Sequence, residues 1–309
     1  MSDFAAIPPV LLRQQQQEPD AFARKLGESF ERFGFAIVAD HGIGDALIER
    51  AWAETKALFE LPLDAKRRHE RPDIAGARGY TPFGIEGAKG ANAIDLKEFW
   101  HIGREGGDGP ANLWPDALPG FRATFTAMFA EFERVGGALL SGIARHLGLP
   151  ADWFAPAVTG GNSTLRLLHY PPIPADAPGV RAGAHEDIDL ITLLLGAEEA
   201  GLQLRDRDGR WLAIRPPAGA LVVNVGDMLQ RLTNHVLPST THRVVNPPPE
   251  RRGVSRYSMP FFLHPRPDFL IETIEGCVSA ENPDRYPEPI TERAYLDERL
   301  VEIGLRKPS

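Results

Sequence analysis

The chain has 309 residues, of which 43% are hydrophobic and 25% are charged, and its formal net charge is -8. This acidic balance lacks the clustered basic surface that nucleic-acid binding requires, so we expect no nucleic-acid partner. The single cysteine, Cys277, excludes an intrachain disulfide or a multi-thiolate metal cluster within one copy, and it favours a reducing, cytoplasmic location. The sequence has neither signal-peptide features nor an apolar run of about 20 residues, so we expect no membrane partner. Oligomeric state is left open.

Residues 1–118 are predicted to form a helical N-terminal region that ends in a lid-like loop. Apolar residues at three- and four-residue steps predict helices at about 22–33 and 45–59, and an apolar run at 35–38 predicts a buried strand between them. Residues 70–118 are rich in Gly and Pro and show no clear periodicity. A loop of this length within a compact protein is usually functional or flexible.

A long amphipathic helix is expected from Pro119 to Leu147, and the character of the sequence then changes. Short β-prone runs separated by Gly, Pro, Asp and Asn clusters fill residues 160–265, which predicts an antiparallel sandwich or barrel. A last helix is expected at about 291–303, within a C-terminal segment at 266–309. We find no repeat and no linker, so the sequence predicts one domain of the α+β class, with a mainly β core and flanking helices.

Three residues in the β-rich region form a candidate metal site. We expect His185 to open a strand that continues through Leu195, which would place His185 and Asp187 on the same face because side chains alternate along a strand. His242, at the start of a later extended run, is the third candidate ligand. Two histidines and one carboxylate form the facial triad of non-haem Fe(II) oxygenases, which leaves positions open for substrates. A His-X-Asp pattern alone is common by chance, and an isolated histidine is more often structural.

A second pair of residues indicates a site for a carboxylate. Arg256 and Ser258 lie two residues apart in the next predicted strand and therefore share a face. An arginine fork binds a carboxylate through two parallel hydrogen bonds, and a neighbouring hydroxyl can supply a third. A surface arginine is the ordinary alternative, but the apolar run that follows, residues 259–263, favours a buried position for Arg256.

Motifs of one family follow one another along nearly the whole chain. In order they are Phe30-X-X-Phe33-Gly34-Phe35, His41-Gly42-Ile43, Arg78-Gly79-Tyr80, Leu96-Lys97-Glu98-Phe99-Trp100, His185-X-Asp187, His242-Arg243-Val244, Arg256-X-Ser258 and Tyr286-Pro287-X-Pro289-Ile290-Thr291. This series resembles the 2-oxoglutarate- and Fe(II)-dependent dioxygenase superfamily, specifically its isopenicillin N synthase-like branch.

The resemblance implies a double-stranded β-helix, or jelly roll, that holds Fe(II) through His185, Asp187 and His242. It also implies that Arg256 and Ser258 bind the far carboxylate of the cosubstrate 2-oxoglutarate, and that O2 is the second cosubstrate. The expected reaction oxidises a small organic substrate, most often by hydroxylation, although desaturation and ring closure use the same centre. The sequence does not identify the substrate.

Tyr170, in Leu168-His169-Tyr170-Pro171-Pro172, matches a tyrosine that contacts the cosubstrate in many relatives. Leu168 departs from the family pattern, because plant members usually carry Asn at this position. The departure puts one polar contact near the cosubstrate in doubt.

Other functions remain open at the level of sequence. Isopenicillin N synthase keeps the Arg-X-Ser pattern without using 2-oxoglutarate, so an Fe(II) oxidase of the same branch that needs no 2-oxoglutarate is one alternative. A metal-binding jelly-roll sensor without catalysis is another. A Zn(II) hydrolase is a third, although it would give Arg256 no role. Further candidates for pocket contacts, which could equally be packing or capping residues, are Asn234, His235, Tyr80, Phe83, Lys97, Glu98 and Trp100.

Overall fold

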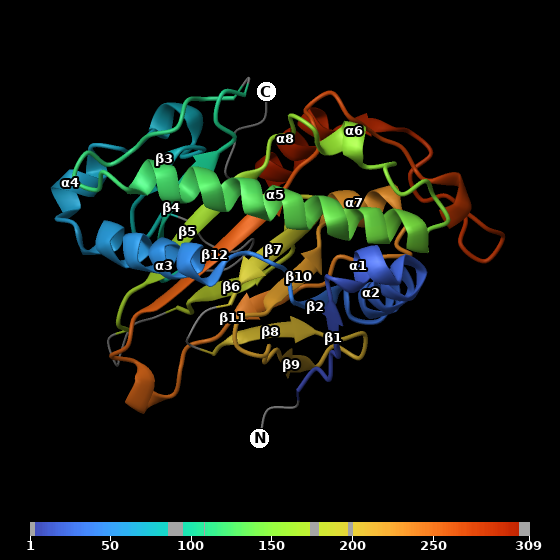
Figure 1. Ribbon diagram of the computed structural model, residues 1–309, viewed down its shortest axis with the longest axis horizontal. Helices are drawn as coiled ribbons and strands as arrows, with labels where there is room; N and C mark the ends of the chain where they lie inside the picture. The colour runs from blue at the N-terminus through green and yellow to red at the C-terminus, as the bar shows by residue number, and fades with distance from the viewer. Residues whose placement is uncertain (1–3, 86–94, 108, 174–178, 197–199, 303–309) are drawn as a thin grey trace.

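The computed structural model describes residues 4–85, 95–107, 109–173, 179–196 and 200–302. Two β-sheets form its core, and helices cover the outer face of the larger sheet (Figure 1). This arrangement agrees with the predicted α+β class with a mainly β core.

The larger sheet has eight strands, and all of its neighbouring pairs are antiparallel except β1 and β2. In spatial order the strands are β1 (Pro9–Leu11), β2 (Phe35–Ala39), β10 (Leu221–Val225), β7 (Ile191–Leu195), β12 (Arg256–Leu263), β5 (Thr164–Tyr170), β4 (Glu98–Gly103) and β3 (Gly79–Thr81). Strands from the N-terminal region therefore occupy both edges of this sheet.

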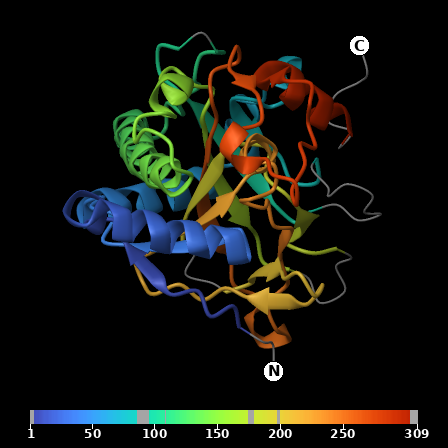
Figure 2. The same cartoon turned by 90° about the vertical axis from the view of Figure 1, so that its right-hand side faces the viewer.

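The smaller sheet has four antiparallel strands and lies against the other face of the larger one (Figure 2). Its strands in order are β6 (Ala182–His185), β11 (His242–Val244), β8 (Leu202–Arg205) and β9 (Trp211–Ala213). A separate two-stranded sheet near the C-terminus pairs β13 (Leu270–Ile271) with β14 (Ile290–Thr291).

Helix α5 is the longest helix and runs across the larger sheet beside α2 and α3 (Figure 1). The helices are α1 (Gln14–Gln17), α2 (Pro19–Phe33), α3 (Asp45–Glu60), α4 (Leu63–Arg67), α5 (Phe121–His146), α6 (Ala155–Val158), α7 (Asp227–Leu232) and α8 (Glu292–Glu302), with 3-10 turns at Pro72–Ile74, Pro249–Arg251 and Glu275–Cys277. Among the described residues, none of these helices is both long and apolar enough to cross a membrane.

The two faces of the larger sheet have different chemistry because side chains alternate along each strand. In β12, Phe261 points toward α5 and packs against the rings of Phe129 and Phe132, at centroid distances of 5.0 and 5.3 Å. The next residues on the opposite face, Pro260 and Phe262, line a pocket between the two sheets. The helix-covered face is therefore the hydrophobic core, and the other face is available for binding.

Two expectations about local structure are corrected. The predicted loop at 70–118 contains β3 and β4, which complete one edge of the larger sheet. These strands have three and six residues, too few to show a periodicity among so many Gly and Pro residues. Pairing of β4 with β5, and of β3 with β4, is what makes them extended. Part of the predicted lid, residues 86–94, lies outside the described residues. The strand expected to run from His185 to Leu195 is in fact two strands in different sheets.

Two adjacent glycines of α5 give a matched test of its packing on the sheet. A Cβ on Gly136 would lie 2.2 Å from Leu263 Cδ1, whereas a Cβ on Gly137 would meet nothing within 4 Å. We expect Gly136→Ala to lower the free energy of unfolding by about 1–3 kcal/mol through overpacking. Gly137→Ala should raise it by up to about 1 kcal/mol through helix propensity. Urea unfolding of both variants measures the two effects, and equal changes would show that α5 does not pack as described.

Candidate active site

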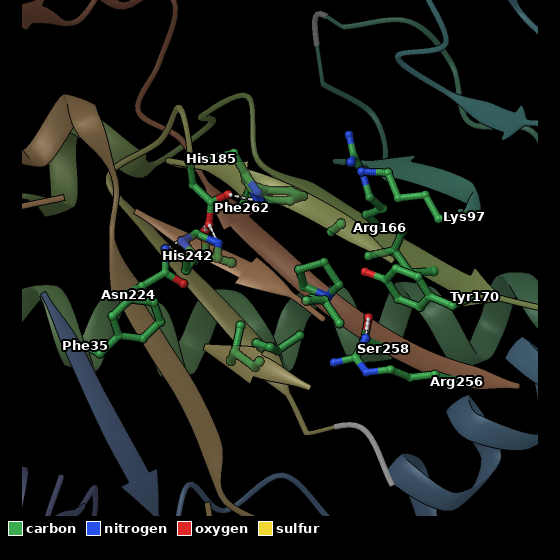
Figure 3. Close-up of a pocket in the computed structure, with 18 residues that line it drawn as sticks. Phe35, Lys97, Arg166, Tyr170, His185, Asn224, His242, Arg256, Ser258 and Phe262 are labelled. Atoms are coloured by element: carbon green, nitrogen blue, oxygen red, sulfur yellow. Dashed lines mark hydrogen bonds and ion pairs between the residues drawn. The ribbon is translucent and has the colours of Figure 1, made fainter. Parts of the chain in front are cut away.

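The three candidate metal ligands meet at the junction of the two sheets. His185 ends β6 and His242 begins β11, and these residues are direct cross-strand partners. Asp187 lies in the connection between β6 and β7, so it is brought to the site by a turn and not by strand alternation as we had expected. The nearest ligand atoms of the three residues all lie within 4.8 Å of one another. The Nε2 atoms of His185 and His242 are 3.7 and 3.8 Å from the Asp187 carboxylate oxygens (Figure 3).

Backbone carbonyls fix the tautomer of both histidines. Nδ1 of His185 lies 2.8 Å from the carbonyl oxygen of Gly183, and Nδ1 of His242 lies 3.1 Å from that of Thr240. A carbonyl oxygen only accepts hydrogen bonds, so each Nδ1 must carry the proton and donate it. Each Nε2 therefore presents a lone pair beside the carboxylate, which is the donor set that a divalent transition metal requires. This arrangement fits an iron ion.

The Asp187 side chain is held from the larger sheet. Its Oδ2 accepts hydrogen bonds from Thr192 Oγ1 of β7, at 2.6 Å, and from Asn224 Nδ2 of β10, at 2.8 Å. Burial opposes ionisation, but the neighbouring His242 and His185 and these two donors together lower the pKa of Asp187 below its usual value. Asp187 is therefore an anion at neutral pH, which is the form that binds a metal.

The backbone of the Asp187 turn is held as firmly as its side chain. The first residues of α7 donate to it, because Asp227 N–H bonds the carbonyl of Asp187 at 2.9 Å and Met228 N–H bonds that of Asp189 at 3.1 Å. Gly226 allows this approach, since a Cβ there would lie 2.0 Å from Asp189 Oδ1. The turn that carries the carboxylate is thus fixed without belonging to a strand.

A second buried carboxyl, Asp189, lies behind Asp187 and shares Thr192 with it. Thr192 Oγ1 is 2.8 Å from Asp189 Oδ2, but one hydroxyl carries one proton and can donate to only one carboxyl. Burial and the charge of Asp187 raise the pKa of Asp189 well above its usual value. A protonated Asp189 can donate to Thr192, which then donates to Asp187. Both hydrogen bonds of the Thr192 hydroxyl can form together only if Asp189 donates to Thr192 and Thr192 donates to Asp187.

Electrostatics also keep His185 neutral. Burial by the surrounding protein, the neighbouring His242 and, more weakly, the charge of Lys97 lower the pKa of His185 to about 4, against the attraction of Asp187. The side chain of His185 is 39% exposed, whereas His242 and Asp187 are exposed by only 9% and 7%. The site is therefore reached from the side of His185.

Arg256 and Ser258 lie on the pocket side of β12, as the alternation of strand residues predicted. Both are buried, and Arg256 Nη1 lies 3.3 Å from Ser258 Oγ. Tyr170 is the cross-strand partner of Arg256, and its ring centroid is 4.9 Å from the Arg256 guanidinium carbon. Leu168 also lines the pocket, and it packs in an apolar cluster with Tyr170.

The pocket between the sheets brings these groups together. It spans about 580 Å³, part of which is open to solvent, and its walls contain the three candidate ligands and Arg256, Ser258 and Tyr170. The rest of its lining consists of Phe35, Lys97, Arg166, Leu168, Ala182, Thr192, Leu194, Leu202, Asn224, Val244, Pro260 and Phe262. Polar and charged groups that converge in one pocket among apolar side chains are typical of a small-molecule site.

Most of the further candidates lie away from this pocket. Lys97 lines it, but Glu98 faces the helices, where it is buried and accepts hydrogen bonds from Lys66 at 2.8 Å and from Tyr80. His169 Nδ1 lies 2.7 Å from the same carboxylate. Burial opposes ionisation of Glu98, yet these three partners hold its pKa below the usual value. Glu98 therefore anchors the N-terminal region to the sheet.

The remaining candidates also have structural surroundings. Trp100 is fully buried, on the helix-covered face, and Phe83 is 49% exposed. Asn234 has a positive φ of 50°, and its Nδ2 lies 3.1 and 3.2 Å from the carbonyl oxygens of Pro283 and Asn282. His235 Nε2 lies 2.6 Å from Tyr286 Oη. Asn234 and His235 therefore hold the C-terminal segment in place.

Comparison with known proteins identifies the family. Residues 161–265 match the sequence model of the 2OG-Fe(II) oxygenase superfamily, and residues 3–117 match that of the N-terminal region called non-haem dioxygenase in morphine synthesis. The proline hydroxylase buaE of Petromyces alliaceus is 33% identical over 306 residues, which cover 94% of this chain and 96% of that protein. The chain belongs to the 2OG-Fe(II) oxygenase superfamily.

Solved structures agree with this assignment over the full fold. A 2OG-Fe(II) oxygenase family protein from Caulobacter crescentus is 53% identical, with a TM-score of 0.90, and the match covers 98% of this chain and 100% of that one. A full-length protein of Neurospora crassa, solved in complex with alpha-KG, another name for 2-oxoglutarate, is 32% identical, with a TM-score of 0.87 and coverage of 96% and 95%. The expected jelly-roll fold is confirmed.

The protein is thus a non-haem Fe(II) oxygenase that couples decarboxylation of 2-oxoglutarate to oxidation of a small organic substrate. Its cofactor is Fe(II), and 2-oxoglutarate and O2 are its cosubstrates. The whole-chain family match favours this function over the non-catalytic sensor, the Zn(II) hydrolase and the oxidase that needs no 2-oxoglutarate.

Sequence reasoning on this oxygenase missed two residues, Thr192 and Asn224, that hold the candidate ligand Asp187. Thr192 and Asn224 lie in apolar runs, Ile191–Leu195 and Leu221–Val225, where each is a polar residue in an otherwise buried strand. That contrast is a usable signal, because a buried polar side chain needs a hydrogen-bond partner. The identity of the partner, Asp187, depends on the packing of the two sheets.

The bond from Thr192 to Asp187 gives a prediction about metal affinity. Thr192→Val removes the hydroxyl without changing the size of the side chain, so we expect Fe(II) affinity to fall about 10–100-fold, as for other groups that orient a ligand. Competition with a chromophoric chelator measures this affinity. Thr55→Val is a matched control, because Thr55 is buried in α3, on the helix-covered face of the larger sheet, and donates to the carbonyl of Ala51. Equal Fe(II) affinity in both variants would contradict the role of Thr192.

Proposed function

We propose that His185, Asp187 and His242 bind the Fe(II) of this oxygenase and that the reaction is hydroxylation of the substrate. The observation that carries the assignment is the convergence of two Nε2 lone pairs and one ionised carboxylate within 4.8 Å at the wall of a pocket. Three ligands on one side of an iron ion leave positions for cosubstrates. Hydroxylation is supported by the relative from Petromyces alliaceus, whose name describes a hydroxylase.

We further propose that Arg256 and Ser258 bind the far carboxylate of 2-oxoglutarate and that Tyr170 contacts this cosubstrate. Arg256 and Ser258 are buried on one face of β12, where the guanidinium and the hydroxyl can donate to the same group. The Tyr170 ring beside Arg256 keeps the guanidinium in place. Leu168, which replaces the Asn usual in plant members, leaves an apolar surface there that suits the methylene carbons of the cosubstrate.

The bound Fe(II) supplies the redox chemistry that converts 2-oxoglutarate, O2 and a C–H bond into succinate, CO2 and an alcohol. The protein orients the reactants and limits access of water to them. Its apolar wall, which includes Leu202 and Val244 beside the metal ligands, serves the second purpose. Phe35 meets the His242 ring edge-on, at 5.5 Å between centroids, and holds that ligand in place.

We also propose that residues 1–309 form one catalytic domain. It comprises the N-terminal region 1–118, the jelly-roll core at about 160–265 and the C-terminal segment 266–309. Pairing of β2 with β10 and of β4 with β5 supports this proposal, since strands of the first region extend the sheet of the second. A cytoplasmic location, favoured by the single cysteine, belongs to the same proposal.

The metal assignment is tested by changing neighbouring carboxylates. Asp187→Ala should abolish Fe(II) binding and turnover, because it removes the anionic ligand. Glu186→Ala is the matched control, since Glu186 points away and accepts a hydrogen bond from Thr241 Oγ1 at 2.9 Å. Fe(II) bound per chain and succinate released from 2-oxoglutarate are measured for each variant. Undiminished Fe(II) binding by the Asp187 variant would refute the assignment.

Anaerobic titration of the Fe(II) enzyme with 2-oxoglutarate tests the cosubstrate site. The visible charge-transfer band of the chelate should appear and saturate. Arg256→Gln removes one charge-assisted hydrogen bond and should therefore weaken 2-oxoglutarate binding about 10–100-fold. The Fe(II) affinity should be unchanged. Arg122→Gln removes the same charge from an exposed position of α5 and should have no effect. Parallel loss of Fe(II) and 2-oxoglutarate in the Arg256 variant would mean that Arg256 is structural.

A further inference from the structure

The C-terminal helix α8 contacts α7, the helix whose first residues hold the Asp187 turn. One face of α8 carries Tyr295 and Arg299, because residues four apart lie one above the other on a helix. Both side chains reach α7. Arg299 Nε donates to Asp227 Oδ2 at 2.9 Å, and the guanidinium carbon of Arg231 lies 5.6 Å from the centroid of the Tyr295 ring. The C-terminal helix is thus attached to the helix that meets the candidate metal site.

Asp227 joins the contact with α8 to the contact with the Asp187 turn. Its backbone N–H donates to the carbonyl of Asp187 at 2.9 Å, and its side chain accepts a hydrogen bond from Arg299. The Asp227 side chain is only 3% exposed, and its other oxygen, Oδ1, has no hydrogen-bond partner among the described residues. The position of this carboxylate therefore depends on Arg299, while the amide of the same residue holds the turn that carries a candidate ligand.

The charges around Asp227 require a cation at this position. The carboxylates of Asp187 and Glu186 are close enough to repel the charge of Asp227, and Arg299 opposes them. Arg299 Nη1 also pairs with Glu302, further along α8, at 2.6 Å, which helps to orient the guanidinium. A buried carboxylate without a paired cation is costly in free energy. Without Arg299, the Asp227 side chain would turn toward water or lose its charge, and α7 would lose this attachment to α8.

The start of α8 is fixed independently of Arg299. Glu292, the first residue of the helix, is fully buried, and its N–H donates to the carbonyl of Phe269 at 2.8 Å. Its carboxylate lies 3.3 Å from Nδ1 of His264, which follows β12. A change at Arg299 leaves these contacts in place, so its effect on the metal site can be measured in a folded protein.

We infer that Arg299 is a positioning residue for the metal site and that it acts on Asp187 through Asp227. The inference rests on the proposed function, because it takes Asp187 as a ligand of Fe(II). Arg299 is not a ligand itself. It keeps the first turn of α7 against the Asp187 turn, and the carboxylate then stays beside the Nε2 atoms of His185 and His242.

A double-mutant cycle tests the path from Arg299 to the metal. Arg299→Met removes the cation and should weaken Fe(II) binding about 3–10-fold, a smaller loss than that expected for a direct partner of Asp187. Asp227→Asn removes the same ion pair from the other side and should have a similar effect. In the Asp227→Asn background, Arg299→Met should add less than about twofold, because the two residues act as one pair. Competition with a chromophoric chelator measures the Fe(II) affinity of each variant.

Further variants separate positioning from a loss of stability. Arg293→Met removes the same charge from an exposed position of α8 and should leave Fe(II) affinity unchanged. Glu292→Gln breaks the pair with His264 at the start of α8, so it should lower the free energy of unfolding in urea without changing Fe(II) affinity. Arg299→Lys keeps the charge and should recover most of the Fe(II) affinity. If Arg299→Met does not fold, Arg299→Gln replaces it in the cycle, with the same expected result.

The outcomes distinguish this inference from the metal assignment. Unchanged Fe(II) affinity in the Arg299 variant, its full effect persisting in the Asp227→Asn background, or an equal loss in Glu292→Gln would overturn the inference. In each of these cases the metal assignment stands if Asp187→Ala abolishes Fe(II) binding in the same assay. Undiminished Fe(II) binding by Asp187→Ala would refute the metal assignment, and this inference with it.

Discussion

The Asp187 carboxylate is the group on which the active site depends, because it joins the two sheets. From the larger sheet it accepts hydrogen bonds from Thr192 and Asn224, and on the other side it faces the imidazoles of His185 and His242 in the smaller sheet. A buried carboxylate is stable only when such partners surround it. The same contacts that ionise Asp187 therefore fix the spacing of the sheets and the shape of the pocket between them.

The alternation of side chains along β12 and β5 divides the molecule into a core and a binding face. On one face, Phe261 packs against α5, and on the other, Arg256 and Ser258 line the pocket. Function can therefore vary on one face without disturbing the core. Arg256 and Ser258, the residues proposed to bind the cosubstrate, lie in a strand, which holds side chains more rigidly than a loop does.

The motif order, the β-rich character of residues 160–265 and the shared face of Arg256 and Ser258 followed from the sequence, whereas strands β3 and β4 did not. The shared face of His185 and Asp187 did not, because the strand we expected there is interrupted between the two residues. Both side chains nevertheless reach the same point, since the backbone of the turn is held by the first residues of α7. Spacing of ligands in a sequence can thus be informative even where the assumed local conformation is wrong.

The sequence by itself determined the family, the β-rich core and the residue types of the proposed metal site, because these depend on local alternation and on short motifs. Only the tertiary structure decided which polar residues serve Asp187, and that Lys97 and Arg166 face the same pocket while Glu98, next to Lys97, faces the core. These relations join residues far apart in the chain, as the contact between Glu98 and His169 shows. No local pattern specifies them, because they arise when distant strands pair and bury their side chains together.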